Sequence, residues 1–322
     1  MDSLVISIVD VFSDLKLYLK NNGKLKLNKK SKEGHFTNII KELKHEKSSE
    51  EFGEYINNFA WVLNNNFSKD DLQNFKKNIR GLSAYGIYFQ VGDIFRFDTF
   101  LGRYDTINNS ISIDLRRDKN KSSIYHELFH MASTRVGDRV IDSGFHHYMG
   151  EKISVGEGLN EGYTDLLTKR YFNETGYETY YNKELIYASL LEQIVGKEKM
   201  ESLYLKGDLR GLMSELEKYD TLDNIKHFIN EIDYIRKSDG IVVDRQRIYN
   251  MNYFLIDAYI RKKVLNGESL NDKNVGMDIM RFYNSVPTEV KVGDNVIKMD
   301  NSIILNESVA PYIQNIDRRN FR

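Results

Sequence analysis

Hydrophobic and polar positions divide the chain into stretches with different periods. Apolar residues recur every three or four positions over Leu4–Leu19 and over Phe52–Leu63, so both stretches predict amphipathic helices. The polar, Lys- and Asn-rich stretch over residues 21–34 predicts a loop between them. A further helix is predicted to begin at Ser68, because a Ser followed by two Asp residues is typical of a helix start. The first 80 residues are therefore expected to be mostly helical.

The period changes at about Gly86. Three short runs rich in β-forming residues follow, namely Ile87–Val91, Ile94–Phe97 and Ser110–Leu115. The last run alternates strictly, with Ile111, Ile113 and Leu115 on one face and polar residues on the other. This pattern predicts a small antiparallel or mixed sheet just before residue 120.

From Ser122 the helical period returns and persists almost to the C-terminus. Gly196 and Gly207 predict helix ends, and Asp244–Asn266 predicts a long helix that Gly267 terminates. Two β-rich runs then flank Gly293–Asp294–Asn295, which predicts a hairpin. We expect an α+β fold in three parts: a helical N-terminal region over residues 1–84, a core over 85–178, and a mainly helical C-terminal subdomain with a terminal hairpin over 179–322.

Composition excludes several classes of protein. The 322 residues include 46 Lys and Arg against 47 Asp and Glu, so the net charge of −1 gives no reason to expect nucleic acid as a partner. No apolar run is long enough for a membrane span, and the N-terminus lacks the pattern of an export signal, which predicts a cytoplasmic protein. The chain has no Cys, so thiolate nucleophiles and Cys-based metal sites are excluded. Seven His residues remain for imidazole chemistry.

Two of these His residues fall in the sequence His126–Glu127–Leu128–Phe129–His130, an H-E-x-x-H pattern. Residues i and i+4 lie on one face of a helix, so His126 and His130 can both reach one metal ion. Glu127 is next to the first His and can reach a water on the metal without binding the ion itself. Ser122 or Ser123 is expected to cap this helix, and Leu128 and Phe129 are expected to face the core.

The alternative is a chance match on an ordinary amphipathic helix, and a third ligand would decide between the two. A catalytic zinc ion has three protein ligands and a fourth position for water. Because the chain lacks Cys, the third ligand must be His, Glu or Asp. The residues directly after His130 are Met131–Val136, which include no further His. This excludes the metzincin pattern.

Downstream, residues 160–165 read Asn-Glu-Gly-Tyr-Thr-Asp. Together with the H-E-x-x-H, this stretch resembles the gluzincins, the thermolysin-like zinc metallopeptidases, whose second motif is N-E-x-x-S/T-D on a following helix. The resemblance implies a zincin-like core with Glu161 as the third zinc ligand and Asp165 as the partner that orients His126. The residues agree, since Glu161 and Asp165 are also i and i+4, and a metal-bound His usually donates its other N–H to a carboxylate. An ordinary acidic helix face is the alternative.

The resemblance also implies a mechanism. One catalytic Zn²⁺ would lower the pKa of a bound water, and Glu127 would act as general base on that water before protonating the leaving amine. An extended peptide or protein substrate could pair with the Ser110–Leu115 strand. Residues that stabilise the oxyanion have no fixed spacing in this family. The candidates are Tyr148 and His147 in the stretch between the motifs, and Tyr249 and Arg247 on the long C-terminal helix, whereas His227 is expected at the surface.

The sequence therefore predicts a zinc-dependent peptidase with His126, His130 and Glu161 as ligands. Two alternatives remain open: an intracellular metalloprotease that acts on one partner protein, and a zincin-like binding protein without turnover. Glu127 argues against the second alternative, because its loss is the usual route to an inactive relative and it is present here. The sequence indicates neither the oligomeric state nor the bond that is cleaved.

Overall fold

A computed structural model describes residues 50–320, except 86, 91–100, 108, 115–117, 119–122, 138–139, 150–152, 173–180, 239–242, 271–272 and 293–294. The helix expected over Leu4–Leu19, the loop after it and the strand over Ile94–Phe97 lie outside these residues. Within the described residues, none of the helices combines the length and the apolar character that crossing a membrane requires. Helices and small sheets occur together, so the α+β class is confirmed.

The chain forms two compact units and passes between them three times, once within helix α6. The first unit ends at Val136 and also takes in Leu167–Glu178. The second comprises Gly137–Leu166 and Thr179–Arg322. The predicted three-part division at residues 84 and 178 stays a prediction.

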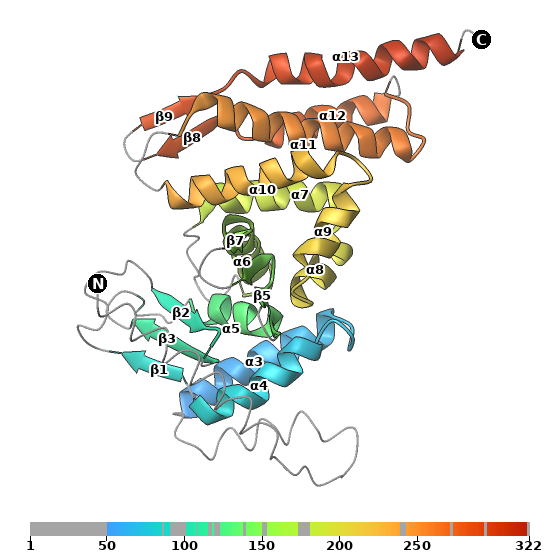
Figure 1. Ribbon diagram of the computed structural model, residues 1–322. Coiled ribbons are helices and arrows are strands. Elements are labelled where there is room, and N and C mark those ends of the chain that lie inside the picture. Colours follow the sequence, from blue (N-terminus) through green and yellow to red (C-terminus); the bar gives the residue numbers. More distant parts are fainter. Residues whose placement is uncertain are drawn as a thin grey trace. The chain divides into compact units, whose positions relative to one another are not determined.

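The first unit combines helices α3 (Glu50–Asn66), α4 (Gln73–Tyr85) and α5 (Ile124–Ser133) with a three-stranded sheet. The helix expected from Ser68 begins at Gln73, because the Ser68 hydroxyl bonds Asp71 within the preceding turn. Helix α5 contacts both the sheet and the two other helices (Figure 1). Its ten residues are all buried, so the expectation that Leu128 and Phe129 face the core is confirmed.

The sheet of the first unit is mixed, as expected, with strand order β1-β3-β2. Strands β1 (Ile87–Gln90) and β3 (Ser110–Asp114) are parallel, whereas β2 (Gly102–Asp105) is antiparallel to β3, with Gly102 opposite Ile113. Because β3 has a neighbour on each side, it has no free edge for a peptide. The expectation that a substrate pairs with the Ser110–Leu115 strand is therefore wrong. Of the three described strands, β2 is the outer one on one side.

Short strands follow α5 where only helices were expected. Strand β4 (Thr134–Val136) is the last element of the first segment of the first unit. In the second unit, an antiparallel meander is formed by β5 (Ile141–Ser143), β6 (His146–Met149) and β7 (Ile153–Val155). The expected return to helices from Ser122 is thus wrong over this stretch. Residues 146–148, in the stretch between the two motifs, lie in β6.

Helix α6 (Glu157–Phe172) follows the meander, and the second unit continues with further helices. These are α7 (Asn182–Val195), α8 (Lys197–Leu205), α9 (Leu209–Leu216), α10 (Leu222–Lys237) and α11 (Arg245–Leu265). Of these, α7, α8 and α11 end where the sequence predicts. Gly196, Gly207 and Gly267 have φ values of 99°, 64° and 76°, the left-handed region in which Gly commonly follows a helix. The long helix is α11, which Asp244 caps by accepting a hydrogen bond from the Gln246 N–H.

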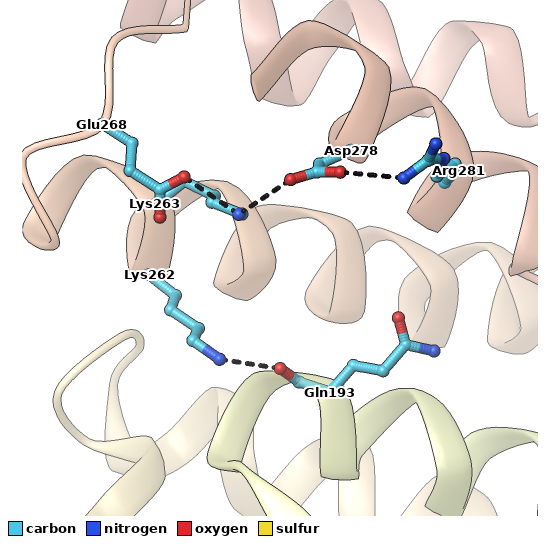
Figure 2. A network of polar contacts seen from close by, with 6 residues as sticks. All are labelled: Gln193, Lys262, Lys263, Glu268, Asp278 and Arg281. Carbon is cyan, nitrogen blue, oxygen red and sulfur yellow. Dashed lines mark hydrogen bonds and ion pairs between the residues drawn. The ribbon is translucent and has the colours of Figure 1, made fainter. Parts of the chain in front are cut away.

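The C-terminal end of α11 is held by ion pairs to its neighbours (Figure 2). Lys263 Nζ lies 3.0 Å from a Glu268 oxygen and 3.4 Å from an oxygen of Asp278, which belongs to α12 (Lys273–Ser285). Lys262 donates to the Gln193 carbonyl at the end of α7, and burial lowers the pKa of Lys262. These contacts tie α7, α11 and α12 together.

The hairpin expected near the C-terminus is confirmed as β8 (Glu289–Val292) and β9 (Asn295–Lys298), but it is not terminal. A helix, α13 (Asn301–Asn320), follows it and packs along α11 (Figure 1). Its first turn is capped by Asp300, which accepts a hydrogen bond from the Ser302 N–H.

Candidate metal centre

Helix α5 carries the H-E-x-x-H residues and is held at both ends by side chains from elsewhere in the first unit. At its start, the Asp118 carboxylate accepts hydrogen bonds from the Ser123 N–H (2.8 Å) and hydroxyl (2.6 Å). Ser123 occupies the N-cap position as expected, but its own hydroxyl makes no cap bond. At the other end, the Asn78 amide donates to the carbonyls of Met131 and Thr134. These bonds fix the rotation and position of α5.

The imidazoles of His126 and His130 converge on one point. Their Nε2 atoms are 2.9 Å apart, and both side chains are buried. Two nitrogens bound to one tetrahedral zinc ion at about 2.0–2.1 Å would be about 3.3 Å apart. The rings therefore need to separate by only about 0.4 Å to hold an ion, a movement within the reach of side-chain torsions.

Glu161 completes the group. One ligand atom from each of His126, His130 and Glu161 lies within 4.8 Å of the others, with both His buried and Glu161 half-buried. The structure thus brings together the three residues that the sequence predicted as ligands. A buried His–His–Glu group of this kind could bind a metal ion.

The stretch of α6 that carries Glu161 is positioned by close backbone contacts in the second unit. Asp233 of α10 accepts hydrogen bonds from the N–H groups of Gly156 (2.7 Å) and Gly158 (2.8 Å), which caps the first turn of α6. A Cβ on Gly158 would be 2.7 Å from the Ile232 carbonyl oxygen, and one on Gly162 would be 2.3 Å from the carbonyl carbon of Glu184. Only Gly permits such an approach on either side of Glu161.

The C-terminal end of α6 is fixed against α5 by aromatic stacking within the first unit. The rings of Tyr125 and Phe172 are stacked at 3.9 Å with an angle of 9°. Phe129 contacts Phe172 edge-on at 5.9 Å, and the Asn58 amide donates to the Tyr125 hydroxyl. These contacts fix the last turn of α6 within the first unit.

Asp165, the predicted partner of His126, is fully buried one turn after Glu161. One of its oxygens accepts a hydrogen bond from the Tyr181 N–H at 3.0 Å, at the start of α7. Thr164, beside it, donates to the Asn160 carbonyl and bonds the Tyr204 hydroxyl at 2.6 Å. The orientation of His126 by Asp165 stays a prediction.

A cation lies near Glu161. The Arg236 guanidinium of α10 packs over the Tyr181 ring at 4.6 Å and donates to its hydroxyl at 3.4 Å. Burial alone would lower the pKa of Arg236, but Tyr181 and the carboxylates of Glu161, Glu157 and Glu184 outweigh burial and raise it. Glu161 therefore has the positive charge of Arg236 in its surroundings.

Glu127 is buried on α5 and lies against the start of β2. A Cβ on Gly102 would be 3.0 Å from both Cγ and Oε1 of Glu127, and 2.9 Å from the Ser123 hydroxyl oxygen. Any residue other than Gly at position 102 would therefore bring its Cβ into close contact with this carboxylate.

The predicted oxyanion candidates between the motifs lie on β6. The ring of Tyr148 packs 3.7 Å from that of His146, whose Nε2 bonds the Ser154 hydroxyl. His147 Nδ1 bonds the Asp142 carboxylate across the meander at 2.6 Å, so its Nε2 is the nitrogen left for other chemistry. Phe145, two residues earlier, donates its N–H to the side chain of Asn160, the residue before Glu161.

The candidates on α11 are engaged elsewhere in the second unit. The Tyr249 hydroxyl donates to Glu307 of α13, and this bond raises its pKa to about 12. Arg247 makes a two-point ion pair with Glu231 at 2.8 Å. His227 is exposed, as expected. A catalytic role of Tyr148 or Tyr249 stays a prediction.

Sequence reasoning missed several residues that shape the site: Asn78, Asp118, Asp233, Arg236 and Gly102. Most act through contacts between distant parts of the chain, and no local pattern marks them. The spacing Gly158-x-x-x-Gly162 around Glu161 is the exception, because two Gly one turn apart in a helix indicate close packing.

Comparison of the chain with protein-family models, with curated proteins and with solved structures finds no match. The assignment of function therefore rests on the motifs and on the geometry of the group.

Proposed function

We propose that the protein is a zinc-dependent peptidase with a zincin-like core of the gluzincin type. The observation that carries this proposal is the convergence of His126, His130 and Glu161, which come from two motifs in the order that gluzincins have. The order of elements also supports it, since a small sheet precedes the helix of the first motif and a second helix supplies the carboxylate.

The residues fit a catalytic zinc ion. Two imidazoles and one carboxylate are ligands that zinc binds, and three protein ligands are typical of catalytic sites, whereas structural sites use four. When bound, zinc would lower the pKa of a water and polarise the carbonyl of the scissile bond. The same ligand set also binds other first-row metals, so metal analysis must identify the ion.

Glu127 is proposed as the general base. It is next to His126 in the chain and buried, so its carboxylate is shielded from bulk solvent. It would accept a proton from the attacking water and transfer it to the leaving amine. Glu127 is not one of the three residues that form the candidate ligand group.

Strand β2 is proposed as the place where an extended peptide binds. Among the strands that the structure describes, it is an outer strand of its sheet. It also contacts α5, and its first residue lies against Glu127. A peptide can add to such an edge through main-chain hydrogen bonds. His147 is the strongest candidate to donate a hydrogen bond to the oxyanion. Because the Asp142 carboxylate holds a proton on Nδ1, donation from Nε2 requires the imidazolium form of the ring.

The test uses a peptide library prepared from a whole proteome and digested with the zinc-loaded protein. We expect defined cleavages with the parent, and a loss of at least about 100-fold with Glu127→Gln, which should retain its metal. The control is Glu157→Gln, one turn before Glu161 on α6, which should cleave like the parent. Equal cleavage by parent and Glu127→Gln would refute the proposal. Cleavage of a single cellular protein and no peptides would favour the partner-specific protease.

A further inference from the structure

The backbone at the start of β2 lies so close to the carboxylate of Glu127 that no side chain fits at position 102 without a shift. Gly102 belongs to the outer strand, and its missing Cβ would be 3.0 Å from two atoms of Glu127 and 2.9 Å from Ser123 Oγ. Ordinary contacts of a Cβ atom begin at about 3.4 Å. The backbone of Gly102 has no positive φ, so its conformation does not explain the Gly.

Neither neighbour can move aside freely. The Ser123 hydroxyl is bound to Asp118 at 2.6 Å, so a rotation that avoids a new methyl group would break this bond. Glu127 is buried on a helix that Asp118 and Asn78 hold at both ends.

Strand β2 is also restrained. Gly102 is paired with Ile113 of β3, and two residues later the buried Tyr104 donates its hydroxyl to Asn109 at 2.8 Å. A methyl group at position 102 would therefore press directly on the side chain of Glu127, two atoms of which it would meet at 3.0 Å.

We propose that Gly102 is a positioning residue for Glu127: the bare backbone at the start of β2 keeps the carboxylate in place, and any side chain there displaces it. This inference rests on the proposed function, since it assigns Gly102 an effect on turnover through the general base. The atoms nearest to an added Cβ at position 102 belong to Ser123 and Glu127, and not to a metal ligand. We therefore expect the site to keep its zinc affinity when Gly102 is replaced.

The experiment compares Gly102→Ala with Gly276→Ala, a helical Gly of α12 whose added Cβ would meet nothing within 4 Å. Zinc affinity is measured by chelator competition, and kcat and KM are measured on a peptide found in the library. Gly102→Ala should lower kcat by about 10-fold, because a misplacement of about 1 Å can cost two orders of magnitude and the overlap here is about 0.4 Å. Zinc affinity should change less than about 3-fold, and Gly276→Ala should match the parent in both.

A double variant separates an effect through Glu127 from a general loss of structure. If Gly102 acts through Glu127, Gly102→Ala should lower kcat little further in the Glu127→Gln background. Crystal structures of the parent and Gly102→Ala give a readout that does not need turnover, with an expected shift of the Glu127 carboxylate of at least about 0.5 Å. An unmoved carboxylate, or a loss of zinc equal to the loss of kcat, would overturn the inference. A parent without turnover would refute the proposed function, and the crystal structures would still decide the role of Gly102.

Discussion

Gly162 offers a direct test of how the helix that carries Glu161 is placed. A Cβ at this position would be 2.3 Å from the carbonyl carbon of Glu184, 2.4 Å from its oxygen and 2.7 Å from the Leu185 nitrogen. All three atoms are backbone atoms at the start of α7, so no side-chain rotation relieves the clash. In Gly162→Ala the two helices must separate by about 1 Å.

The expected cost follows from this geometry. Overpacking of a core costs about 1–3 kcal/mol, and backbone against backbone belongs at the upper end of that range. The higher helix propensity of Ala returns up to about 1 kcal/mol. The net destabilisation should be about 2 kcal/mol, a change of about 30-fold in the unfolding equilibrium. Because Glu161 moves with its neighbour, zinc affinity should fall by at least about 10-fold.

Urea unfolding followed by circular dichroism measures the stability change, and chelator competition measures the affinity. Gly276→Ala is the matched control, since its methyl group enters open space within a helix and should stabilise the protein by about 0.5–1 kcal/mol. The same substitution is thus expected to have opposite signs at the two sites. A Gly162→Ala protein as stable as the parent would refute the packing of α6 against α7.

Three further predictions follow from buried polar groups. Tyr187→Phe should stabilise the protein by about 1 kcal/mol in urea unfolding, because the buried hydroxyl has no hydrogen-bond partner among the residues that the structure describes; destabilisation would indicate a partner elsewhere in the chain. Burial raises the pKa of Asp233 above 3.8, although its hydrogen bonds from Gly156 and Gly158 act in the opposite direction. The folded protein therefore holds this proton more tightly than the unfolded chain does. The resulting stabilisation is complete below pH 3.8 and is lost as the pH rises through the raised pKa. Unfolding free energies between pH 4 and 7 should therefore fall more steeply with pH in the parent than in Asp233→Asn, and parallel profiles would contradict this. Asp165→Ala should weaken zinc binding by about 10- to 100-fold, and an unchanged Kd would show that Asp165 does not support a ligand.

The ligand set was predictable from the sequence because it depends on local geometry. His126 and His130 are four residues apart, so they share one face of any helix that contains them. The absence of Cys restricted the third ligand to His, Glu or Asp. The long helix α11 and the hairpin β8–β9 were predictable for the same reason, since Asp244, Gly267 and the turn residues mark their ends locally.

The parts that sequence reasoning missed depend on short elements or on distant contacts. Strands β4, β5 and β7 have three residues each, too few to show a period, and the three polar residues at the start of β6 mask its strand character. Helix α13 contains Pro311, which argues against a helix in the sequence alone. Asp233 and Arg236 affect α6 from more than 70 residues away, so only the folded chain reveals them.

The most direct test of the account is the metal content of the purified protein, measured by mass spectrometry after reconstitution with Zn²⁺ and removal of the excess. We predict about one zinc ion per chain in the parent and in Glu157→Gln, and a loss of most of it in Glu161→Ala and His130→Ala. A parent without zinc, or full zinc content in Glu161→Ala, would contradict the His126–His130–Glu161 centre on which the proposed function rests.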